Sequence, residues 1–332
     1  MNLLKSYRSI RAVAARYSVS LWTSRAVPAA NWWNSVCWSP ELGIFCAVSA
    51  NGTLDNAVMT SPDGITWTSR SVPSPLQWRS VCWSPELSLF VAVTDFGAGA
   101  NAVMTSPNGI NWTLRSVPLT NQWNSVCWSP ELRIFVVTSF NGTAADQVMT
   151  SPDGINWTLR SVPVALSCRA VCWSAELGLF CAVAINGSLA DQVMTSPNGI
   201  NWTSRAVPVV NTWGSVCWSA ELGLFCAVAY GGTVANMVMT SPDGITWTSR
   251  TIPVALQWRS VCWSPELSLF CAVAYNGAVA NAVMTSPDGI NWTSRPVPVA
   301  LQWWSVCWSG ELCLFVAVAT SGTVANQVMT ST

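Results

Sequence analysis

The chain has 332 residues, of which 51% are hydrophobic and 9% are charged, and its 15 basic and 15 acidic residues cancel. So many apolar residues and so few charges exclude an intrinsically disordered chain. A neutral balance, with a pI near 6.2, also gives no general electrostatic attraction to nucleic acid or to an anionic membrane surface.

The first 18 residues form a segment of their own. They include Lys5, Arg8, Arg11 and Arg16 but no acidic residue, and apolar side chains recur among them at helical spacing. This pattern predicts a short basic helix or tail. It is also typical of a mitochondrial transit peptide, so a targeting role stays open. Because the segment lacks the apolar run of a secretory signal, we expect an intracellular, reducing location.

A 45-residue repeat fills residues 19–332, which we take as one domain. Each unit contains four short runs bounded by Pro, Gly, Asn or Asp, which are strand and turn signals. Four antiparallel strands in about 40 to 45 residues are typical of a β-propeller blade. The tripeptide Val-Cys-Trp marks seven blades, which we expect to begin near residues 33, 78, 123, 168, 213, 258 and 303.

One uncharged stretch, residues 222–242, has the length of a membrane span. Gly231, Gly232 and Asn236 interrupt it, and its copies in other units carry Asp146 and Asp191. We therefore interpret it as two strands joined by a turn and expect no membrane span.

The two ends of the chain complement each other. The seventh unit stops after its third strand, and the missing fourth strand is found at residues 20–28, where Trp22 and Arg25 occupy the repeat positions. A propeller closed in this way leaves no open edge between its first and last blades. The sequence thus predicts an all-β, seven-bladed β-propeller whose N-terminal strand completes blade seven.

The first hairpin of each blade predicts how neighbouring blades pack. Its turn sets Trp38 opposite Phe45 and Cys37 opposite Cys46. Side chains alternate across a strand, so each blade has a bulky face and a small face that can interdigitate with its neighbours.

The cysteines follow the same repeat. Seven of them lie 45 residues apart and the chain has no histidine, which disfavours a metal site, and no cofactor is expected. Four facing pairs permit cross-strand disulfides, but three blades carry Val91, Val136 or Val316 at the second position. A position that accepts valine behaves as a small apolar site, so we favour buried thiols.

Six turns share the pattern Ser-x-Asp-Gly-x-x-Trp, with Asn in place of Asp in two of them, as in Ser286, Asp288, Gly289 and Trp292. The pattern resembles the Asp-box, or BNR repeat, of sialidase-like β-propellers, with one residue fewer between Asp and Trp. The resemblance implies a structural turn away from any active site, in which the Asp or Asn side chain accepts backbone hydrogen bonds and Gly takes a positive φ. The repeated position is occupied by Asp63, Asn108, Asp153, Asn198, Asp243 and Asp288.

Each unit also carries one Glu in its first turn and one Arg in its fourth strand. We interpret them as solvated or paired charges that contribute little.

The loops divide the expected propeller into two faces. The first-to-second and third-to-fourth strand turns, on the uniform face, are nearly the same in every unit, whereas the second-to-third strand loops and the inter-blade loops, on the variable face, differ. Loops on a rigid scaffold carry specificity, so the variable face is the candidate binding surface.

Arginine recurs in alternate blades where the innermost strand begins. Arg79, Arg169 and Arg259, with Trp304 at the same position of blade seven, could form an anion-binding cluster, or the arginines are repeated by duplication without a ligand. The sialidase-like families hold a carboxylate with an arginine triad, but they also use a tyrosine nucleophile with an acidic partner. Tyr230 and Tyr275 lie in variable loops without a nearby Glu, which disfavours hydrolysis.

We therefore expect a non-enzymatic binding or assembly scaffold that holds a protein partner, with self-assembly as one form of it. The alternatives are a multivalent lectin, with Trp32, Trp33, Trp303 and Trp304 as candidate sugar contacts, and, less favoured, a sialidase-like glycoside hydrolase.

Overall fold

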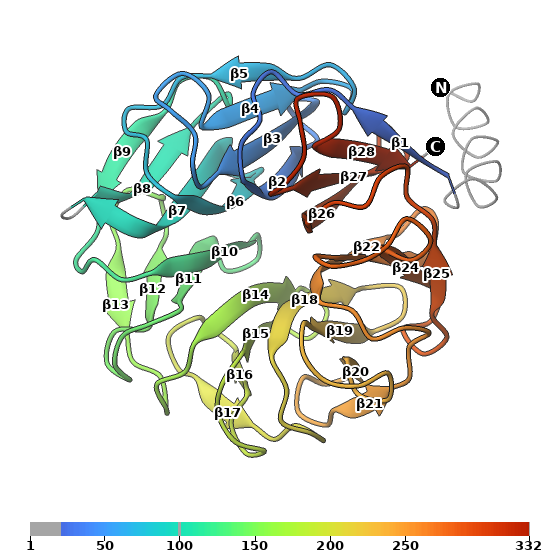
Figure 1. Ribbon diagram of the computed structural model, residues 1–332. Helices are drawn as coiled ribbons and strands as arrows, with labels where there is room; N and C mark the ends of the chain where they lie inside the picture. The colour runs from blue at the N-terminus through green and yellow to red at the C-terminus, as the bar shows by residue number, and fades with distance from the viewer. Residues whose placement is uncertain (1–20, 99–100, 332) are drawn as a thin grey trace, which may run out of the picture.

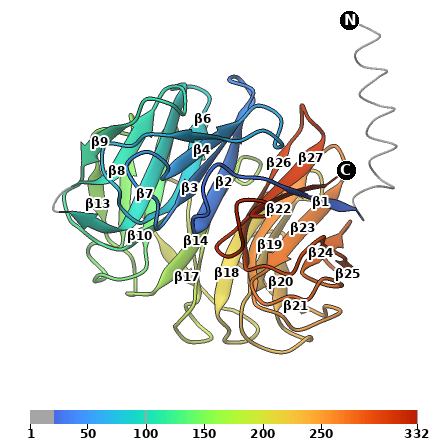
Figure 2. The same cartoon turned by 45° about the horizontal axis from the view of Figure 1, so that its top comes forward.

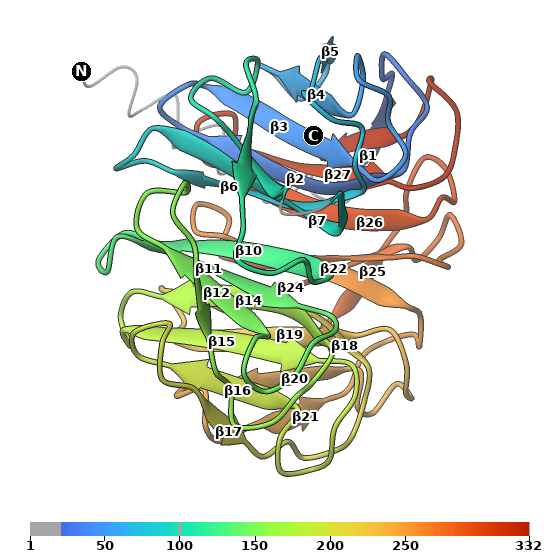
Figure 3. The same cartoon turned by 90° about the vertical axis from the view of Figure 1, so that its left-hand side faces the viewer.

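The computed structural model describes residues 21–98 and 101–331, and the basic segment predicted over residues 1–18 lies outside them. The described strands form seven four-stranded antiparallel sheets arranged as blades around a central axis (Figure 1). Figure 2 shows the sheets side by side around the ring, and Figure 3 shows the loops projecting from its two faces. Within these residues, no helix has the length and apolar character needed to cross a membrane.

The strands run outward from the axis in chain order. The innermost strands are β2 (Trp33–Ser39), β6 (Trp78–Ser84), β10 (Trp123–Ser129), β14 (Cys168–Ser174), β18 (Trp213–Ser219), β22 (Trp258–Ser264) and β26 (Trp303–Ser309). The second strands are β3 (Ile44–Ser49), β7 (Leu89–Ala98), β11 (Ile134–Ser139), β15 (Leu179–Ala184), β19 (Leu224–Ala229), β23 (Leu269–Ala274) and β27 (Leu314–Ala319). The third strands are β4 (Val58–Ser61), β8 (Asn101–Ser106), β12 (Val148–Ser151), β16 (Val193–Ser196), β20 (Val238–Ser241), β24 (Val283–Ser286) and β28 (Val328–Ser331). The outer strands are β5 (Thr68–Arg70), β9 (Thr113–Ser116), β13 (Thr158–Arg160), β17 (Thr203–Arg205), β21 (Thr248–Arg250), β25 (Thr293–Arg295) and β1 (Trp22–Arg25).

The ring closes as predicted. Strand β1 pairs antiparallel with β28, with Trp22 opposite Ser331 and Arg25 opposite Val328, so the last sheet has the order β1-β28-β27-β26. The uncharged stretch 222–242 contains β19 and β20 joined by a loop, which confirms its interpretation as two strands.

The predicted register of the first hairpin is confirmed, with Cys37 opposite Cys46 and Trp38 opposite Phe45. The Trp38 and Phe45 rings are 4.5 Å apart between centroids. In the next blade, Trp83 and Phe90 pack in one cluster with Cys46 and Val48 of the first. The bulky face of each blade therefore fills the small face of the preceding one, which accounts for the strict alternation of large and small residues.

The facing cysteine pairs are in the thiol form. Cys46 is fully buried, and burial raises the pKa of both Cys37 and Cys46 well above the ordinary value for a thiol. A thiol that does not ionise is a poor nucleophile, so these side chains serve as small apolar packing groups. The reducing location of the protein stays a prediction.

The repeated Glu residues are hydrogen-bonded to the neighbouring blade, a contact that the sequence analysis did not predict. Each accepts a hydrogen bond at 2.6 or 2.7 Å from the indole N–H of the following blade. The carboxylates thus join the seven blades in a closed circle of hydrogen bonds. The donor and acceptor pairs are Trp38 and Glu311, Trp83 and Glu41, Trp128 and Glu86, Trp173 and Glu131, Trp218 and Glu176, Trp263 and Glu221, and Trp308 and Glu266.

The repeated Arg residues act within each blade. Their Nε atoms donate to a threonine hydroxyl of the neighbouring third strand at 2.8 or 2.9 Å, as Arg70 does to Thr60. The repeated acids and bases are therefore not partners of each other, and both hold the sheets together.

The repeated Ser-x-Asp/Asn-Gly-x-x-Trp turns have the predicted backbone hydrogen bonds. In the first, the N–H groups of Ile65 and Thr66 donate to Asp63 Oδ1, and Gly64 has a φ of +72°. The indole N–H of Trp67 donates to the Gly64 carbonyl at 3.0 Å and fixes the ring over the outer core. Asn108 accepts the equivalent backbone hydrogen bonds at 2.9 Å, which explains why asparagine replaces aspartate without loss of the turn.

We predict a pH dependence from the Asp153 turn. Partial burial opposes ionisation, but hydrogen bonds from the Asn156 and Ile155 N–H groups and from the side chains of Asn156 and Ser151 outweigh it and lower the Asp153 pKa to about 2. A depressed pKa in the folded state stabilises the fold above the ordinary Asp pKa of about 3.9, and this stabilisation is lost as the pH falls toward 2. The difference in urea midpoint between the wild type and Asp153→Asn should therefore shrink as the pH is lowered from about 5 to 2.

Asn108→Asp is the matched gain-of-charge variant, because Asn108 occupies the same position in its turn. It should acquire the pH dependence that Asp153→Asn loses. A difference in urea midpoint that stays constant over this pH range would contradict the assignment.

Candidate binding site at the mouth of the central channel

A ring of seven residues, six of them with side chains, surrounds the axis on the variable face. Each comes from the second residue of an innermost strand, at a bulge where the register shifts, such as that between Trp33 and Ser35. A bulge leaves its extra residue out of the ladder and re-aims its side chain, here toward the channel. The ring lines a cavity of about 120 Å³ and consists of Asn34, Arg79, Asn124, Arg169, Gly214, Arg259 and Trp304.

A second set of residues lies beside this ring, at the repeat position that follows the second strand in most blades and falls within the longer β7 in blade two. Its members share one repeat position, but Asp95 stands where Tyr230 and Tyr275 stand in other blades. Asp95 is a site residue that the sequence argument missed. Its position in the repeat, equivalent to those of the two tyrosines, is the signal that could have found it.

Arg79 is neutralised within the protein. Its guanidinium forms an ion pair with Asp95, and no other ion pair is present among residues 21–98 and 101–331. Burial raises the pKa of Asp95, although Arg79 and Arg169 act in the opposite direction. The pair thus occupies one side of the channel mouth as a charged hydrogen-bonded unit.

Arg169 lacks such a counter-ion. Its Nη1 atom donates to Asn124 Oδ1 at 3.2 Å, and its guanidinium carbon lies 5.3 Å from the centre of the Trp304 ring. Burial, together with the positive charges of Arg259 and Arg79, lowers the pKa of Arg169 to about 10, against the favourable effect of Tyr230 and Asp95. Arg169 therefore stays charged at neutral pH in surroundings that disfavour its charge.

Arg259 is enclosed by aromatic rings. Its guanidinium carbon lies 4.0 Å from the Tyr230 ring centre, 4.7 Å from that of Trp304 and 5.1 Å from that of Tyr275. Cation–π contacts stabilise the charge but accept few of its N–H hydrogen bonds. The Arg259 Nε atom is buried without a hydrogen-bond acceptor, and burial lowers the Arg259 pKa.

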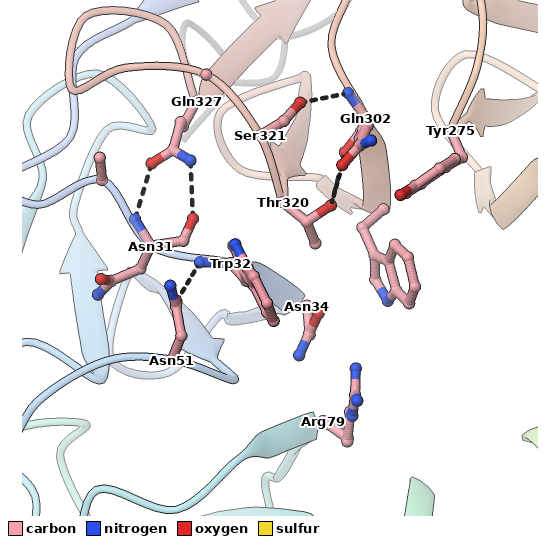
Figure 4. Close-up of a pocket in the computed structure, with 13 residues that line it drawn as sticks. Asn31, Trp32, Asn34, Asn51, Arg79, Tyr275, Gln302, Thr320, Ser321 and Gln327 are labelled. Carbon is pink, nitrogen blue, oxygen red and sulfur yellow. Dashed lines mark hydrogen bonds between the residues drawn. The ribbon is translucent and has the colours of Figure 1, made fainter.

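A larger pocket of about 450 Å³ opens beside the channel, at the junction of blades seven and one (Figure 4). It shares Asn34, Arg79 and Trp304 with the channel ring. Its outer wall is Trp32, which is 56% exposed and whose backbone N–H donates to Asn51 Oδ1 at 2.5 Å.

The four tryptophans proposed as sugar contacts separate into two kinds. Trp33 and Trp303 are fully buried and belong to the core, whereas Trp32 and Trp304 line the pocket. The repeat position of Trp32 carries Gln, Ser or Thr in the other blades, so its aromatic wall is specific to this junction.

Tyr230 and Tyr275 lie against the Arg259 guanidinium. Both phenol rings contact it, and Tyr275 also meets Trp304 edge-on at 5.7 Å. Neither a guanidinium nor an indole accepts the phenolic proton, so neither of these contacts supplies a general base.

No protein-family model and no curated protein matches the chain. Among solved structures, YCF48 from Cyanidioschyzon merolae is 14% identical with a TM-score of 0.66, over 94% of this chain and 98% of that one. A streptogramin B lyase is 8% identical with a TM-score of 0.76, over 94% and 97%. A chain of the Mitotic Checkpoint Complex is 12% identical with a TM-score of 0.64, over 94% and 90%. At such low identities the likeness shows the propeller fold alone.

Proposed function

We propose that this protein is a non-enzymatic binding propeller that holds a protein partner on its variable face. The observation that carries the proposal is the distribution of differences between the blades. Loops of the uniform face repeat with little change, whereas those of the variable face differ and surround the channel mouth and the pocket. Differences confined to one face of a regular scaffold are typical of a surface that recognises a ligand.

The variable face also carries exposed apolar side chains. Trp32 and Phe96 are 56% and 54% exposed, and aliphatic residues at one repeat position of the second-to-third strand loops are exposed in five blades. Aromatic anchors surrounded by aliphatic and neutral polar side chains are typical of protein interfaces. The aliphatic positions are Leu54, Leu189, Val234, Val279 and Val324.

The comparisons support this proposal at the level of the fold. A chain of the Mitotic Checkpoint Complex has the same architecture. The streptogramin B lyase has it too, so the fold also occurs in a protein that is named as an enzyme. The tyrosine contacts described above favour binding over chemistry here.

The proposal predicts a face-specific interaction. The immobilised wild type should retain a partner protein from native extract. The amount retained should fall at least tenfold when Trp32 and Phe96 are both replaced by alanine, because aromatic anchors dominate interface energies. Both side chains are largely exposed, so the fold should be unaffected. Quantitative mass spectrometry of the retained proteins gives the readout.

Leu42→Ala is the matched control, since Leu42 is 39% exposed and lies in a turn of the uniform face. It should leave retention unchanged. Retention that survives the double variant, or that Leu42→Ala abolishes, would contradict a partner site on the variable face.

A single sugar site is the second candidate function. The 450 Å³ pocket combines the exposed ring of Trp32 with polar side chains, among them Gln302, Thr320 and Ser321. Exposed aromatic faces and hydrogen-bonding side chains together suit a carbohydrate. A glycan-array signal that is lost in Trp32→Ala would assign the pocket to a sugar and displace the protein-partner proposal.

A further inference from the structure

We propose that the mouth of the central channel is an anion-binding site, in which the guanidinium groups of Arg169 and Arg259 together hold one compact oxyanion such as a phosphate or a carboxylate. This goes beyond the proposed partner docking, because the site is formed by the axial ring alone and binds the free anion.

The charge balance of the mouth is the first argument. Three guanidinium groups and one carboxylate meet there, and the carboxylate of Asp95 is paired with Arg79. Two positive charges, on Arg169 and Arg259, are left without a counter-ion among the described residues. Half-buried cations that repel each other are unfavourable unless something neutralises them, and a bound anion does so.

Unused hydrogen-bond donors are the second argument. A guanidinium offers five N–H donors, but Arg169 has one hydrogen bond to Asn124, and Arg259 has a side-chain hydrogen bond with Tyr230 and is otherwise enclosed by ring faces. The Nε of Arg259 is buried and has no acceptor among the described residues. The aromatic contacts of both arginines with Trp304 orient the two groups while leaving N–H groups for a ligand.

The lining of the cavity is the third argument. Six serines at the next position of the innermost strands face the same cavity of about 120 Å³. The Oγ atom of each of these serines accepts a hydrogen bond from a backbone N–H of the next blade. The serine O–H can therefore donate to a ligand. A cavity of this size, lined by donors and cations, suits a compact oxyanion. The serines are Ser35, Ser80, Ser125, Ser215, Ser260 and Ser305.

The three arginines therefore differ in role although they share one repeat position. Arg79 belongs to an internal ion pair, and Arg169 and Arg259 bind the anion. This asymmetry argues against arginines that are merely repeated by duplication. It also predicts that replacing Arg169 or Arg259 weakens anion binding, whereas replacing Asp95 strengthens it.

Equilibrium dialysis with radiolabelled inorganic phosphate tests the site on the full chain, with sodium chloride at matched ionic strength as the background. We expect one saturable phosphate per chain. Arg169→Gln and Arg259→Gln should each weaken binding at least tenfold. Each also removes a repelling cation, so the unfolding temperature without phosphate should not fall, which separates lost binding from lost fold.

Asp95→Asn has the opposite expected effect. It removes the one carboxylate from the mouth and frees the charge of Arg79, so phosphate should bind severalfold more tightly. Arg133→Gln, which changes an arginine in a turn of the uniform face, should leave binding unchanged.

The absence of a saturable site would overturn the proposal, as would equal binding by the wild type and both arginine variants. Weaker binding in Asp95→Asn would also overturn it, because a structural disturbance and not charge would then explain the results. None of these outcomes bears on the partner proposal, whose test uses Trp32 and Phe96.

Discussion

Trp22→Ala is expected to lower the free energy of unfolding by about 3 to 5 kcal/mol, the range for truncating a buried tryptophan. Trp22 is 7% exposed, its ring centroid lies 6.4 Å from that of Phe315, and it belongs to the same buried cluster as Met329 in the last blade. Because β1 is the outer strand of that blade, the substitution should also loosen the closure and expose the edge of β28. Urea unfolding followed by circular dichroism measures the effect.

Two phenylalanine variants test the local contacts of this position. Among the described residues, the buried indole N–H of Trp22 has no acceptor, whereas that of the equivalent Trp67 donates to the Gly64 carbonyl. Trp22→Phe should therefore cost about 1 kcal/mol less than Trp67→Phe. If Trp22→Ala stayed within about 0.5 kcal/mol of the wild type, as a surface substitution does, the closed ring would be contradicted.

Glu86→Ala is expected to lower the free energy of unfolding by about 1 to 2 kcal/mol. Glu86 accepts the indole N–H of Trp128 in the next blade at 2.6 Å, and Trp128 is 7% exposed. Hydrogen bonds to charged groups contribute about 1.5 to 3 kcal/mol, and the exposure of Glu86 to water places this one at the lower end.

A double-mutant cycle with Trp128→Phe isolates this contact, because phenylalanine keeps the ring packing but lacks the N–H. We expect a coupling free energy of about 1 kcal/mol in urea unfolding. Additive effects of the two substitutions would mean that the carboxylate does not stabilise the junction between the blades.

The architecture could be predicted from the sequence because its determinants are local and repeated. The 45-residue period fixes the number of blades, the turn at Glu41 fixes the register of Trp38 with Phe45, and the unmatched strand near Trp22 fixes the closure. Each of these depends on neighbours within one hairpin or on the chain ends, where period-two alternation is decisive.

The site was only partly predictable because its contacts cross the ring. The positions of Arg79, Arg169 and Arg259 could be found from the period, but the stacking of Arg169 and Arg259 on Trp304 depends on how the bulges aim side chains across the axis. The ion pair of Arg79 with Asp95 lies within one hairpin, so Asp95 is the local signal that separates Arg79 from the other two arginines.

The hydrogen bonds of the repeated Glu residues were not predicted, for a related reason. Glu86 and Trp128 are 42 residues apart, and only the stacking of two blades brings them together. A charge in a turn with no partner in its own hairpin gives no sequence sign of such a contact.

The two faces of the propeller have different roles in this account. The uniform face carries the Ser-x-Asp/Asn-Gly-x-x-Trp turns and the Glu–Trp hydrogen bonds, which hold the ring, so its sequence can repeat. The variable face carries the residues that differ between blades, including the channel mouth and the Trp32 pocket. Binding can thus change through loop substitutions while the scaffold stays the same.

Hydrogen exchange of the protein bound to its retained partner is the most direct test of the central claim. The account predicts slower amide exchange in the second-to-third strand loops and the inter-blade loops, around Trp32 and Tyr275. Protection confined to the turns of the uniform face, such as those at Glu41 and Asp63, would contradict it.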